Sequence, residues 1–148
     1  MKLDHVYIAT APLQTLSDLE WEALCDHCGR CCLVKLEDDE TNEVFYTNMI
    51  CRKYDLELGR CSCYPTRKQQ VPGCVDIRNF PEDIYSQLPE TCAYRLRFNE
   101  QPLPKWHPLV AGDNSKMDQL MPHIKYRAVS EESIHEEQFE DHIIHDIK

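Results

Sequence analysis

Apolar and polar residues alternate along this chain in short runs, which predict short elements rather than long helices or strands. The clearest run spans residues 17–24, where Ser17 stands three residues before Glu20 in the form of a capping box and the apolar residues share one helical face. We therefore expect a short helix that leads directly into Cys25. Residues 1–14 show no such periodicity, and the expectation there is an irregular or extended lead-in.

Two β units are expected after this helix. The β-prone runs 33–36 and 44–47 flank the polar stretch 37–43, a pattern typical of a hairpin. The acidic stretch lacks the alternating oxygen ligands and the turn glycine of a calcium loop, so we interpret it as a solvated hairpin tip. A second pair of short strands is expected over 50–64, about a turn at Gly59-Arg60, and this turn would bring the cysteines of that segment together.

The second half of the chain is predicted to be less regular. Residues 79–88 have Pro81 in their first turn and Pro89 just beyond their end, which predicts a short helix. The segment 99–125 is rich in proline and is expected to be mostly loop. The last residues, about 130–148, contain another capping-box match at Ser133 and predict an acidic C-terminal helix.

Composition and charge narrow the range of folds and partners. With 42% hydrophobic residues, the 148 residues can build a modest core, and the simplest organisation is a single domain over 1–148 with its core at about 20–95. The formal charge of −10, much of it within 131–148, is unsuited to nucleic acid. No window approaches the ~18 apolar residues of a membrane span, and no secretory leader is visible. We expect a cytoplasmic protein with neither nucleic-acid nor membrane partner.

Nine cysteines are the strongest functional signal in the sequence. Four of them fall within the octet Cys25-Asp-His-Cys-Gly-Arg-Cys-Cys32. In a reducing cytoplasm, thiols at this density are expected to bind metal rather than to form disulfides, and the odd number of cysteines also weighs against complete pairing. All nine are candidate metal ligands: Cys25, Cys28, Cys31, Cys32, Cys51, Cys61, Cys63, Cys74 and Cys92.

The spacing within the octet indicates a thiolate centre but leaves its metal open. Cys25 and Cys28 followed by Gly29 have the form of a metal knuckle, in which glycine takes positive φ and lets backbone amides point at sulfur. With Cys31 they have the C-x-x-C-x-x-C spacing of an iron–sulfur loop, whereas zinc would take pairs of cysteines from two segments. The adjacent pair Cys31–Cys32 favours two sites or a polynuclear centre. We expect zinc or iron, or an iron–sulfur cluster, in one or two centres; a thioredoxin-like motif is a rival that expects a βαβ setting not seen in the pattern.

The cysteine positions resemble the CxxCxxCC cysteine-cluster family, which is described as a zinc- or iron-chelating domain. The match consists of the octet, a lone Cys51, the element Cys61-Ser-Cys-Tyr64-Pro-Thr-Arg67, and Cys74 after a proline. The resemblance implies that the ligands in this chain are Cys25, Cys28, Cys31, Cys32, Cys51, Cys61 and Cys74.

Two positions depart from that family pattern. Cys63 stands where the family commonly has an aliphatic residue, and Lys68 follows Arg67 where the family usually has proline. The segments 88–95 and 103–109 carry a closer similarity to a bacterial subgroup, the uncharacterised YcgN-like proteins. The resemblance implies a metal-chelating protein and says little more about its role.

The leading expectation is a cytoplasmic zinc- or iron-binding protein whose metal organises a small α+β fold of short helices, β-hairpins and long loops. One alternative is an iron or iron–sulfur enzyme that acts on a peptide or protein; its candidate non-ligand groups are Tyr64, Arg67, Trp106 and His107. Simpler roles exist for two of them: Arg67 can cap a loop or pair with an acid, and His107 can be a packed or hydrogen-bonded loop residue. The other alternative is a zinc-stabilised adaptor that presents its acidic C-terminal helix to a protein partner. The sequence does not decide whether the protein is an enzyme.

Overall fold

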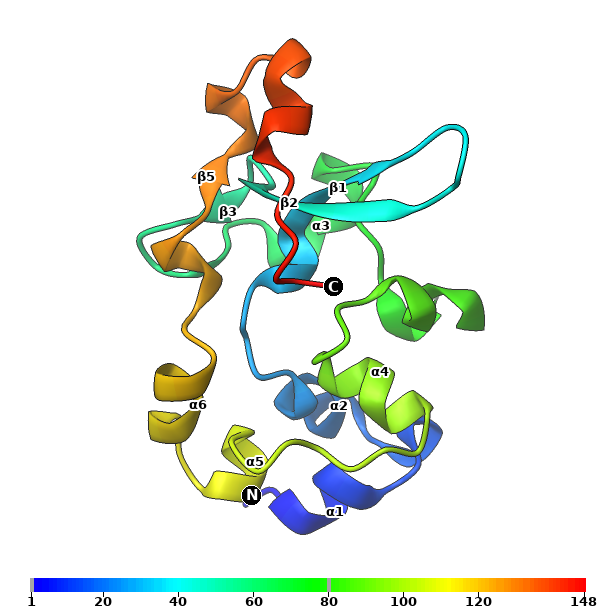
Figure 1. Cartoon of the computed structure of the whole chain (residues 1–148). Coiled ribbons are helices and arrows are strands. Elements are labelled where there is room, and N and C mark those ends of the chain that lie inside the picture. Colours follow the sequence, from blue (N-terminus) through cyan, green and yellow to red (C-terminus); the bar gives the residue numbers. More distant parts are fainter. Residues whose placement is uncertain (1, 80) are drawn as a thin grey trace. The chain divides into compact units, whose positions relative to one another are not determined.

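The computed structural model describes residues 2–79 and 81–148, and its helices and strands are short (Figure 1). The α-helices are α1 (His5–Thr10), α2 (Asp18–Leu24), α3 (Arg67–Gln70), α4 (Ala93–Phe98), α5 (Pro108–Ala111) and α6 (Ser115–Leu120). The strands are β1 (Leu33–Glu37), β2 (Val44–Ile50), β3 (Tyr54–Asp55), β4 (Arg60–Cys61) and β5 (Val129–Ser130). Short helices, small sheets and long loops confirm the predicted α+β class. No helix within the described residues is both long and apolar enough to cross a membrane.

Backbone contacts divide the chain into two compact units. The helical unit comprises Met1–Cys28 and Phe80–Pro122, and the sheet unit comprises Gly29–Asn79 and His123–Lys148. Each unit is assembled from two separated stretches of the sequence, and the border between the first two stretches falls inside the cysteine octet. The organisation as a single domain over 1–148 stays a prediction.

In the helical unit, the predicted helix that leads into Cys25 is confirmed as α2. The Ser17 hydroxyl accepts the Glu20 amide at 3.2 Å, and the Glu20 carboxylate accepts the Ser17 amide at 2.8 Å, which completes the capping box. Trp21 of α2 stacks on Tyr94 of α4 with ring centroids 4.6 Å apart. The Tyr94 hydroxyl also donates to the Trp21 carbonyl at 2.8 Å. The two helices are thus joined by ring packing and by a buried hydrogen bond.

The N-terminal segment is helical, and the expectation of an irregular lead-in over 1–14 is wrong. Asp4 caps α1 by accepting the Tyr7 amide at 3.0 Å. Ile8 is fully buried, and α1 packs against α2 and α5. A helix of six residues with one buried apolar side chain has too few positions to show a period in the sequence, so its stability comes from the packing.

The proline-rich segment 99–125 contains α5 and α6 as well as loops. α5 begins with His107 as its cap and Pro108 as its first residue, and it ends at Gly112 with φ of 96°. The proline and the glycine are therefore helix boundaries here rather than loop residues. The short helix expected over 79–88 forms instead as a 3₁₀ helix, Glu82–Gln87.

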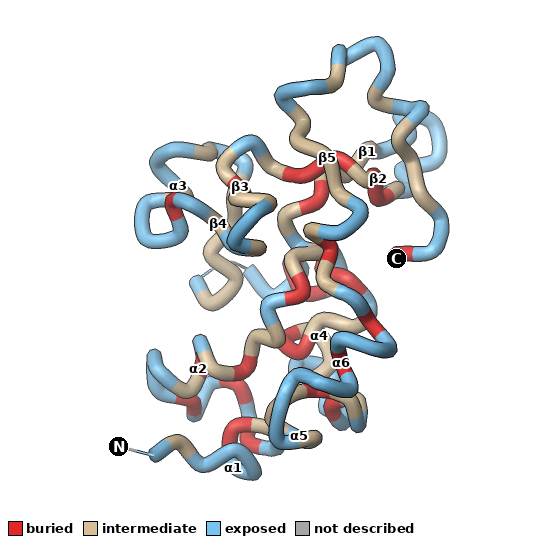
Figure 2. The backbone as a smooth tube through the Cα atoms, turned by 90° about the vertical axis from the view of Figure 1, so that its left-hand side faces the viewer, coloured by how far each residue is buried: buried red, intermediate tan, exposed pale blue. Residues whose placement is uncertain are grey.

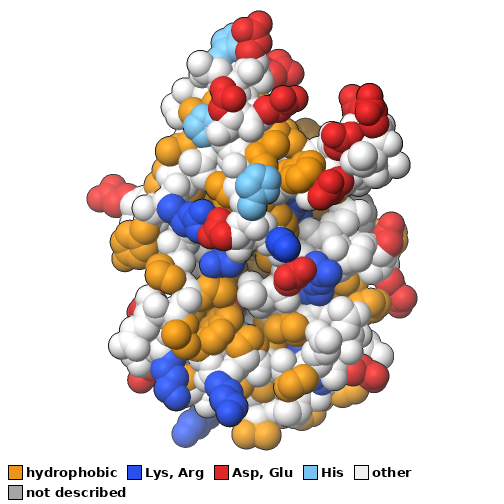
Figure 3. All heavy atoms as spheres, in the orientation of Figure 1, with side chains coloured by type: hydrophobic (Ala, Val, Ile, Leu, Met, Phe, Trp, Pro, Cys, Tyr) orange, Lys and Arg blue, Asp and Glu red, His pale blue; other side chains and the backbone are white. Residues whose placement is uncertain are grey.

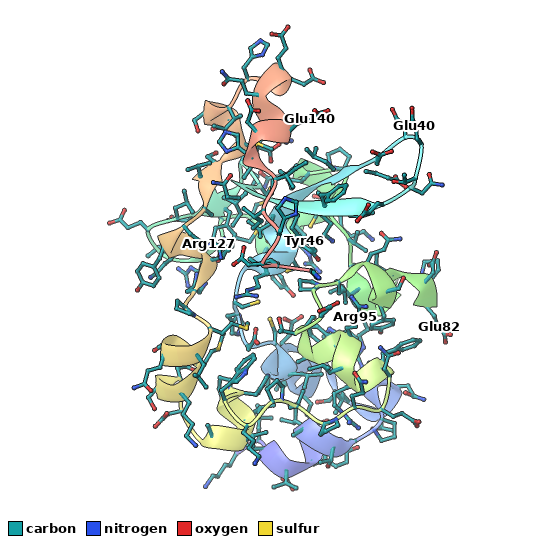
Figure 4. The ribbon with its side chains drawn as sticks, viewed as in Figure 1. Glu40, Tyr46, Glu82, Arg95, Arg127 and Glu140 are labelled. Carbon is teal, nitrogen blue, oxygen red and sulfur yellow. The ribbon has the colours of Figure 1, made fainter. Side chains whose placement is uncertain are left out.

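In the sheet unit, the predicted hairpin is confirmed. β1 and β2 pair antiparallel, with Glu37 opposite Val44 and Leu33 opposite Ile50. At its tip, the Asp38 carboxylate accepts the amides of Thr41 at 3.0 Å and Glu40 at 2.8 Å, and these bonds hold the pKa of Asp38 below its usual value. Figure 4 shows Glu40 pointing away from the protein, as expected for a solvated tip.

Two further strand pairs complete the sheet unit. β5 pairs in parallel with β2, with Met49 opposite Val129, and β3 pairs antiparallel with β4, with Tyr54 opposite Cys61. The β3–β4 pair confirms the second β unit expected over 50–64. The buried residues of this unit (red in Figure 2) include one apolar cluster: Leu33, Tyr46, Ile50, Tyr54, Ile124 and Ile147.

The acidic C-terminal segment does not form the continuous helix expected over 130–148. It contains two 3₁₀ helices, Glu131–Ser133 and Glu136–His142, whose caps are Ser130 and His135 rather than Ser133. The chain then runs extended along β2, where the Ile144 amide donates to the Tyr46 carbonyl at 2.9 Å. Extended backbone lets the chain bury Ile147, which a weakly amphipathic helix would not do. Figure 3 shows acidic side chains gathered at the hairpin tip and over this C-terminal segment.

Candidate metal centre

The octet has two of the features expected of a metal knuckle, a glycine with positive φ and an amide that points at a cysteine sulfur. Cys25 ends α2, and its sulfur accepts the backbone amide of His27 at 3.3 Å. His27 has φ of 60° and Gly29 has φ of 81°, so the backbone turns twice through the left-handed region within the octet. An amide that points at sulfur stabilises a thiolate and fixes its direction.

Gly29 is required by space as well as by backbone conformation. A Cβ atom at this position would lie 2.5 Å from Cγ2 of Ile124 and 2.6 Å from the hydroxyl of Tyr54. Both neighbours belong to the core of the sheet unit. The turn that separates Cys28 from Cys31 is therefore packed directly on that core.

Three of the nine cysteines lie in the helical unit. Cys28 is buried and packs with Met117, Met121 and Trp106, the surroundings of a small apolar side chain. Cys25 and Cys92 are half-buried, and Cys92 occupies the position before α4, where its carbonyl accepts the Leu96 amide at 2.9 Å.

The other six cysteines lie in the sheet unit: Cys31, Cys32, Cys51, Cys61, Cys63 and Cys74. Cys51 is tied to the octet, because its amide donates to the Cys32 carbonyl at 3.0 Å. The sulfur atoms of Cys61 and Cys63 are 3.9 Å apart. The Cys51 carbonyl accepts the amide of Tyr54 at 2.9 Å, and Tyr54 is the strand partner of Cys61, so the turn brings these cysteines together as the sequence predicted.

Burial and neighbouring thiols raise the pKa values of three cysteines of the sheet unit. The pKa of Cys32 is raised by its hydrogen bond with Cys31, then by burial and by the charges of Cys31, Cys51 and Cys61. Burial raises the pKa of Cys63, with a further increase from its bond to Cys61. Burial also raises the pKa of Cys74, although Arg67 and the Val75 amide act in the opposite direction. Several thiolates this close repel one another, so a cation beside them would favour their ionised form.

The fit of these sulfur atoms to a metal ion can be judged from one distance. Zinc–sulfur bonds of about 2.3 Å at tetrahedral angles place two sulfur ligands about 3.8 Å apart. The 3.9 Å between Cys61 and Cys63 matches that separation. Among the residues that the structure describes, no group of three or more histidine, cysteine, aspartate or glutamate side chains converges closely enough to hold an ion. One pair of ligands thus fits, and a complete ligand set does not form within the described residues.

The thiol-bearing loops have little core of their own. In the stretch 51–79, the buried residues are Tyr54 and Cys63. A surface pocket of about 440 Å³ lies beside the β3–β4 turn and is lined by Leu58, Cys61 and Tyr64 among others. The sulfur-rich part of the sheet unit is thus open to solvent on one side.

Arg67, a candidate for substrate binding, is held by its own neighbours. Its guanidinium lies 4.1 Å from the ring centroid of Tyr64 and donates to the Tyr64 carbonyl at 2.8 Å. It also lies 3.9 Å from the carboxylate of Asp76. The pKa of Asp76 is lowered, first by a hydrogen bond from Asn79 and then by Arg67. The interpretation of Arg67 as a loop cap paired with an acid is confirmed.

His107 is a structural residue, and both of its ring nitrogens are occupied. Its Nδ1 accepts the Leu109 amide at 3.1 Å, and its Nε2 lies 3.0 Å from the Leu24 carbonyl. Because a carbonyl only accepts, Nε2 carries the hydrogen and the ring is neutral. Burial lowers the pKa of His107, while the charge of Asp26 acts to raise it. The interpretation of His107 as a hydrogen-bonded loop residue is confirmed, and Leu24, whose carbonyl it holds, directly precedes Cys25.

Two histidine contacts were not expected from the sequence. The ring nitrogen Nε2 of His123 lies 3.1 Å from the Tyr54 hydroxyl, and Nδ1 of His142 lies 2.8 Å from the side-chain oxygen of Asn48. The paired residues are 69 and 94 positions apart in the chain. No local spacing could have signalled either contact.

Comparison with known proteins identifies relatives along nearly the whole chain. No model of a protein family matches the sequence, and no solved structure matches it either. A UPF0260 protein of Marinobacter nauticus is 45% identical over 133 residues, which is 90% of each chain. A UPF0260 protein of Pseudomonas putida is 45% identical over 132 residues (89% of this chain and 88% of the relative), and one of Proteus mirabilis is 43% identical over 142 residues (96% and 95%). This chain belongs to the UPF0260 family, which these bacterial relatives share.

Proposed function

We propose that this protein is a cytoplasmic metal-binding protein that holds zinc or iron, or an iron–sulfur cluster, through cysteine thiolates in one or two centres. One observation carries the proposal: six of the nine cysteines lie in the sheet unit, and the sulfur atoms of Cys61 and Cys63 have the separation of two ligands on one ion. The resemblance of the cysteine positions to the CxxCxxCC cysteine-cluster family supports the same function.

A bound cation would change the ionisation of these thiols. Burial and neighbouring sulfur atoms raise the pKa of Cys32 and of Cys63, so these groups ionise reluctantly without a positive charge beside them. A bound divalent ion would favour the thiolate form and release protons as it binds.

The sparse core around the cysteines supports a metal that organises the fold. Residues 51–79 contain little buried apolar surface, and structural zinc can contribute on the order of 10 kcal/mol to folding. Cys51, Cys61, Cys63 and Cys74 would supply a first centre together with Cys31 or Cys32. A second centre would draw on Cys25, Cys28 and Cys92 of the helical unit.

The two alternative functions gain no support from a specific contact. An enzyme acting on a peptide or protein would need free polar groups, whereas Arg67 is paired with Tyr64 and Asp76, and both nitrogens of His107 are bonded. An adaptor would present its acidic C-terminal segment to a protein partner. That segment forms short 3₁₀ helices here rather than a binding helix. Nucleic acid and membranes are not proposed as partners, because the formal charge is −10 and the described helices are short.

Metal analysis of protein purified without oxygen tests the proposal. We expect stoichiometric zinc or iron, with visible absorption if the metal is iron. Cys61→Ser and Cys63→Ser should each lower the metal content, whereas Ser62→Ala, which changes the residue between them and no sulfur, should not. Protein that is free of metal after anaerobic purification, and that also fails to bind added zinc or ferrous ion, would exclude the proposed function.

A further inference from the structure

Cys61 and Cys63 differ in accessibility although their sulfur atoms are only 3.9 Å apart. Cys61 is half-buried and lines the surface pocket beside the β3–β4 turn, whereas Cys63 is 7% exposed. Ser62 between them is anchored, because its amide donates to the Lys53 carbonyl at 2.8 Å. The turn therefore places a partly exposed cysteine next to a buried one.

We propose that Cys61 and Cys63 are a site of reversible oxidation, which forms a disulfide when a small hydroperoxide enters the pocket beside Cys61. The formation of this bond does not depend on the proposed function. Its consequence does: if both sulfur atoms are metal ligands, the disulfide removes them from the metal together, and the sheet unit releases its ion.

The reaction balances with the hydroperoxide as the only oxidant. The Cys61 thiolate attacks one peroxide oxygen, the O–O bond breaks, and an alcohol or water leaves as Cys61 becomes a sulfenic acid. The Cys63 sulfur then attacks the Cys61 sulfur, the S–O bond breaks, the S–S bond forms, and water leaves with the thiol proton. Two thiols lose two hydrogen atoms in total, and the hydroperoxide is reduced.

The geometry favours this pair over other thiols of the sheet unit. A disulfide bond is about 2.05 Å long, so the two sulfur atoms must approach by roughly 1.9 Å, which rotation of the side chains about their χ1 bonds can supply. Cys31 and Cys32 are also hydrogen-bonded to each other, but they are adjacent in sequence. A disulfide between adjacent residues closes a small strained ring, so that pair is a poor competitor.

Peptide mapping of the full-length protein tests the proposal, and the sequence provides a convenient fragment. Trypsin cleaves after Arg60 and after Arg67, so the peptide 61–67 carries Cys61 and Cys63 and no other cysteine. After treatment with one equivalent of hydrogen peroxide and alkylation of free thiols, this peptide should lack two hydrogen atoms and carry no alkyl group. It should reach this state before any other cysteine-bearing peptide is modified, and a reductant should reverse the change.

Two variants and a measurement of metal release distinguish this inference from the proposed function. Cys63→Ser should leave Cys61 as a sulfenic acid that a sulfenic-acid probe traps, whereas Ser62→Ala should behave as the wild type. Peroxide should also release metal from loaded protein in step with disulfide formation. A wild-type peptide 61–67 that stays fully alkylated while other cysteines oxidise overturns the inference, even if the protein binds metal. A disulfide in a protein that never binds metal supports the oxidation site and excludes only the metal-binding function.

Discussion

The helical unit and the sheet unit are of similar length but are held together differently. The helical unit buries aromatic and aliphatic side chains throughout, with Trp21 stacked on Tyr94 and Tyr85 on Phe98 at 4.2 Å. The sheet unit has its apolar cluster around β2, while its stretch 51–79 buries only Tyr54 and Cys63. The buried contacts of the helical unit extend over its whole length, whereas the thiol-rich loops of the sheet unit have little core. Small folds with that deficit are commonly completed by a metal or by disulfides.

Removal of metal should reveal the largest difference between the two units. Chelation should loosen residues 51–79 far more than α2 and α4, because a lost structural site removes on the order of 10 kcal/mol of folding free energy. Hydrogen exchange measured by mass spectrometry, with and without chelator, reports each segment separately. Equal protection of both units before and after chelation would contradict the idea that metal completes the sheet unit.

A substitution at Gly29, in the turn of the octet, should cause the next largest loss of unfolding free energy. Gly29→Ala places a methyl group within 2.5 Å of Ile124 at a positive φ, so we expect a loss of about 3 kcal/mol of unfolding free energy. Gly112→Ala in the helical unit is the matched control, because it has positive φ but no atom within 4 Å, and it should cost about 1 kcal/mol. Urea denaturation of both variants measures the difference. Equal losses would mean that the core does not press on Gly29.

Loss of the His107 hydrogen bonds should affect the helical unit to a smaller degree. His107→Leu leaves the Leu24 carbonyl and the Leu109 amide without their partner, and we expect a cost of about 2 kcal/mol. Since Leu24 precedes Cys25, the alkylation rate of Cys25 should also change, while that of Cys74 should not. His135→Leu is the control, because His135 is exposed and caps only the short helix Glu136–His142. Unchanged stability and an unchanged Cys25 rate would show that these bonds do not order the octet.

Mild acid should weaken the helical unit through the same histidine. Burial lowers the pKa of His107, so the unfolded chain binds its proton at a higher pH than the folded protein does. The neutral His107 ring therefore makes its full contribution to the free energy of unfolding at pH values above the unfolded pKa of 6.5. As the pH falls below 6.5, that contribution declines by at most about 1.4 kcal/mol per pH unit. Thermal unfolding between pH 7 and pH 5 checks the trend, and His107→Leu should lose this part of it.

Local signals in the sequence predicted those parts of the fold that depend on neighbouring residues. The Ser17 capping box, the hairpin and the β3–β4 pair all rest on contacts within a few positions, and each is confirmed. The C-terminal segment was predicted wrongly because pairing with β2, far away in the chain, outweighed its local helical signal. The features of the candidate site also differ in whether local sequence could predict them. Spacing identified the cysteines and the positive φ of Gly29, but contacts such as that of His107 with Leu24 join residues too distant for any spacing rule.

The parallel pairing of β5 with β2 also affects the order in which this protein can fold during synthesis. Met49 is opposite Val129, so the ribosome must make a further eighty residues before this part of the sheet can close. At about 5–20 residues per second, Cys74 emerges several seconds before β5 does. All the cysteines of the sheet unit thus leave the ribosome while the last strand of their sheet is still unmade, which would give a nascent chain time to bind the proposed metal ion before the sheet closes.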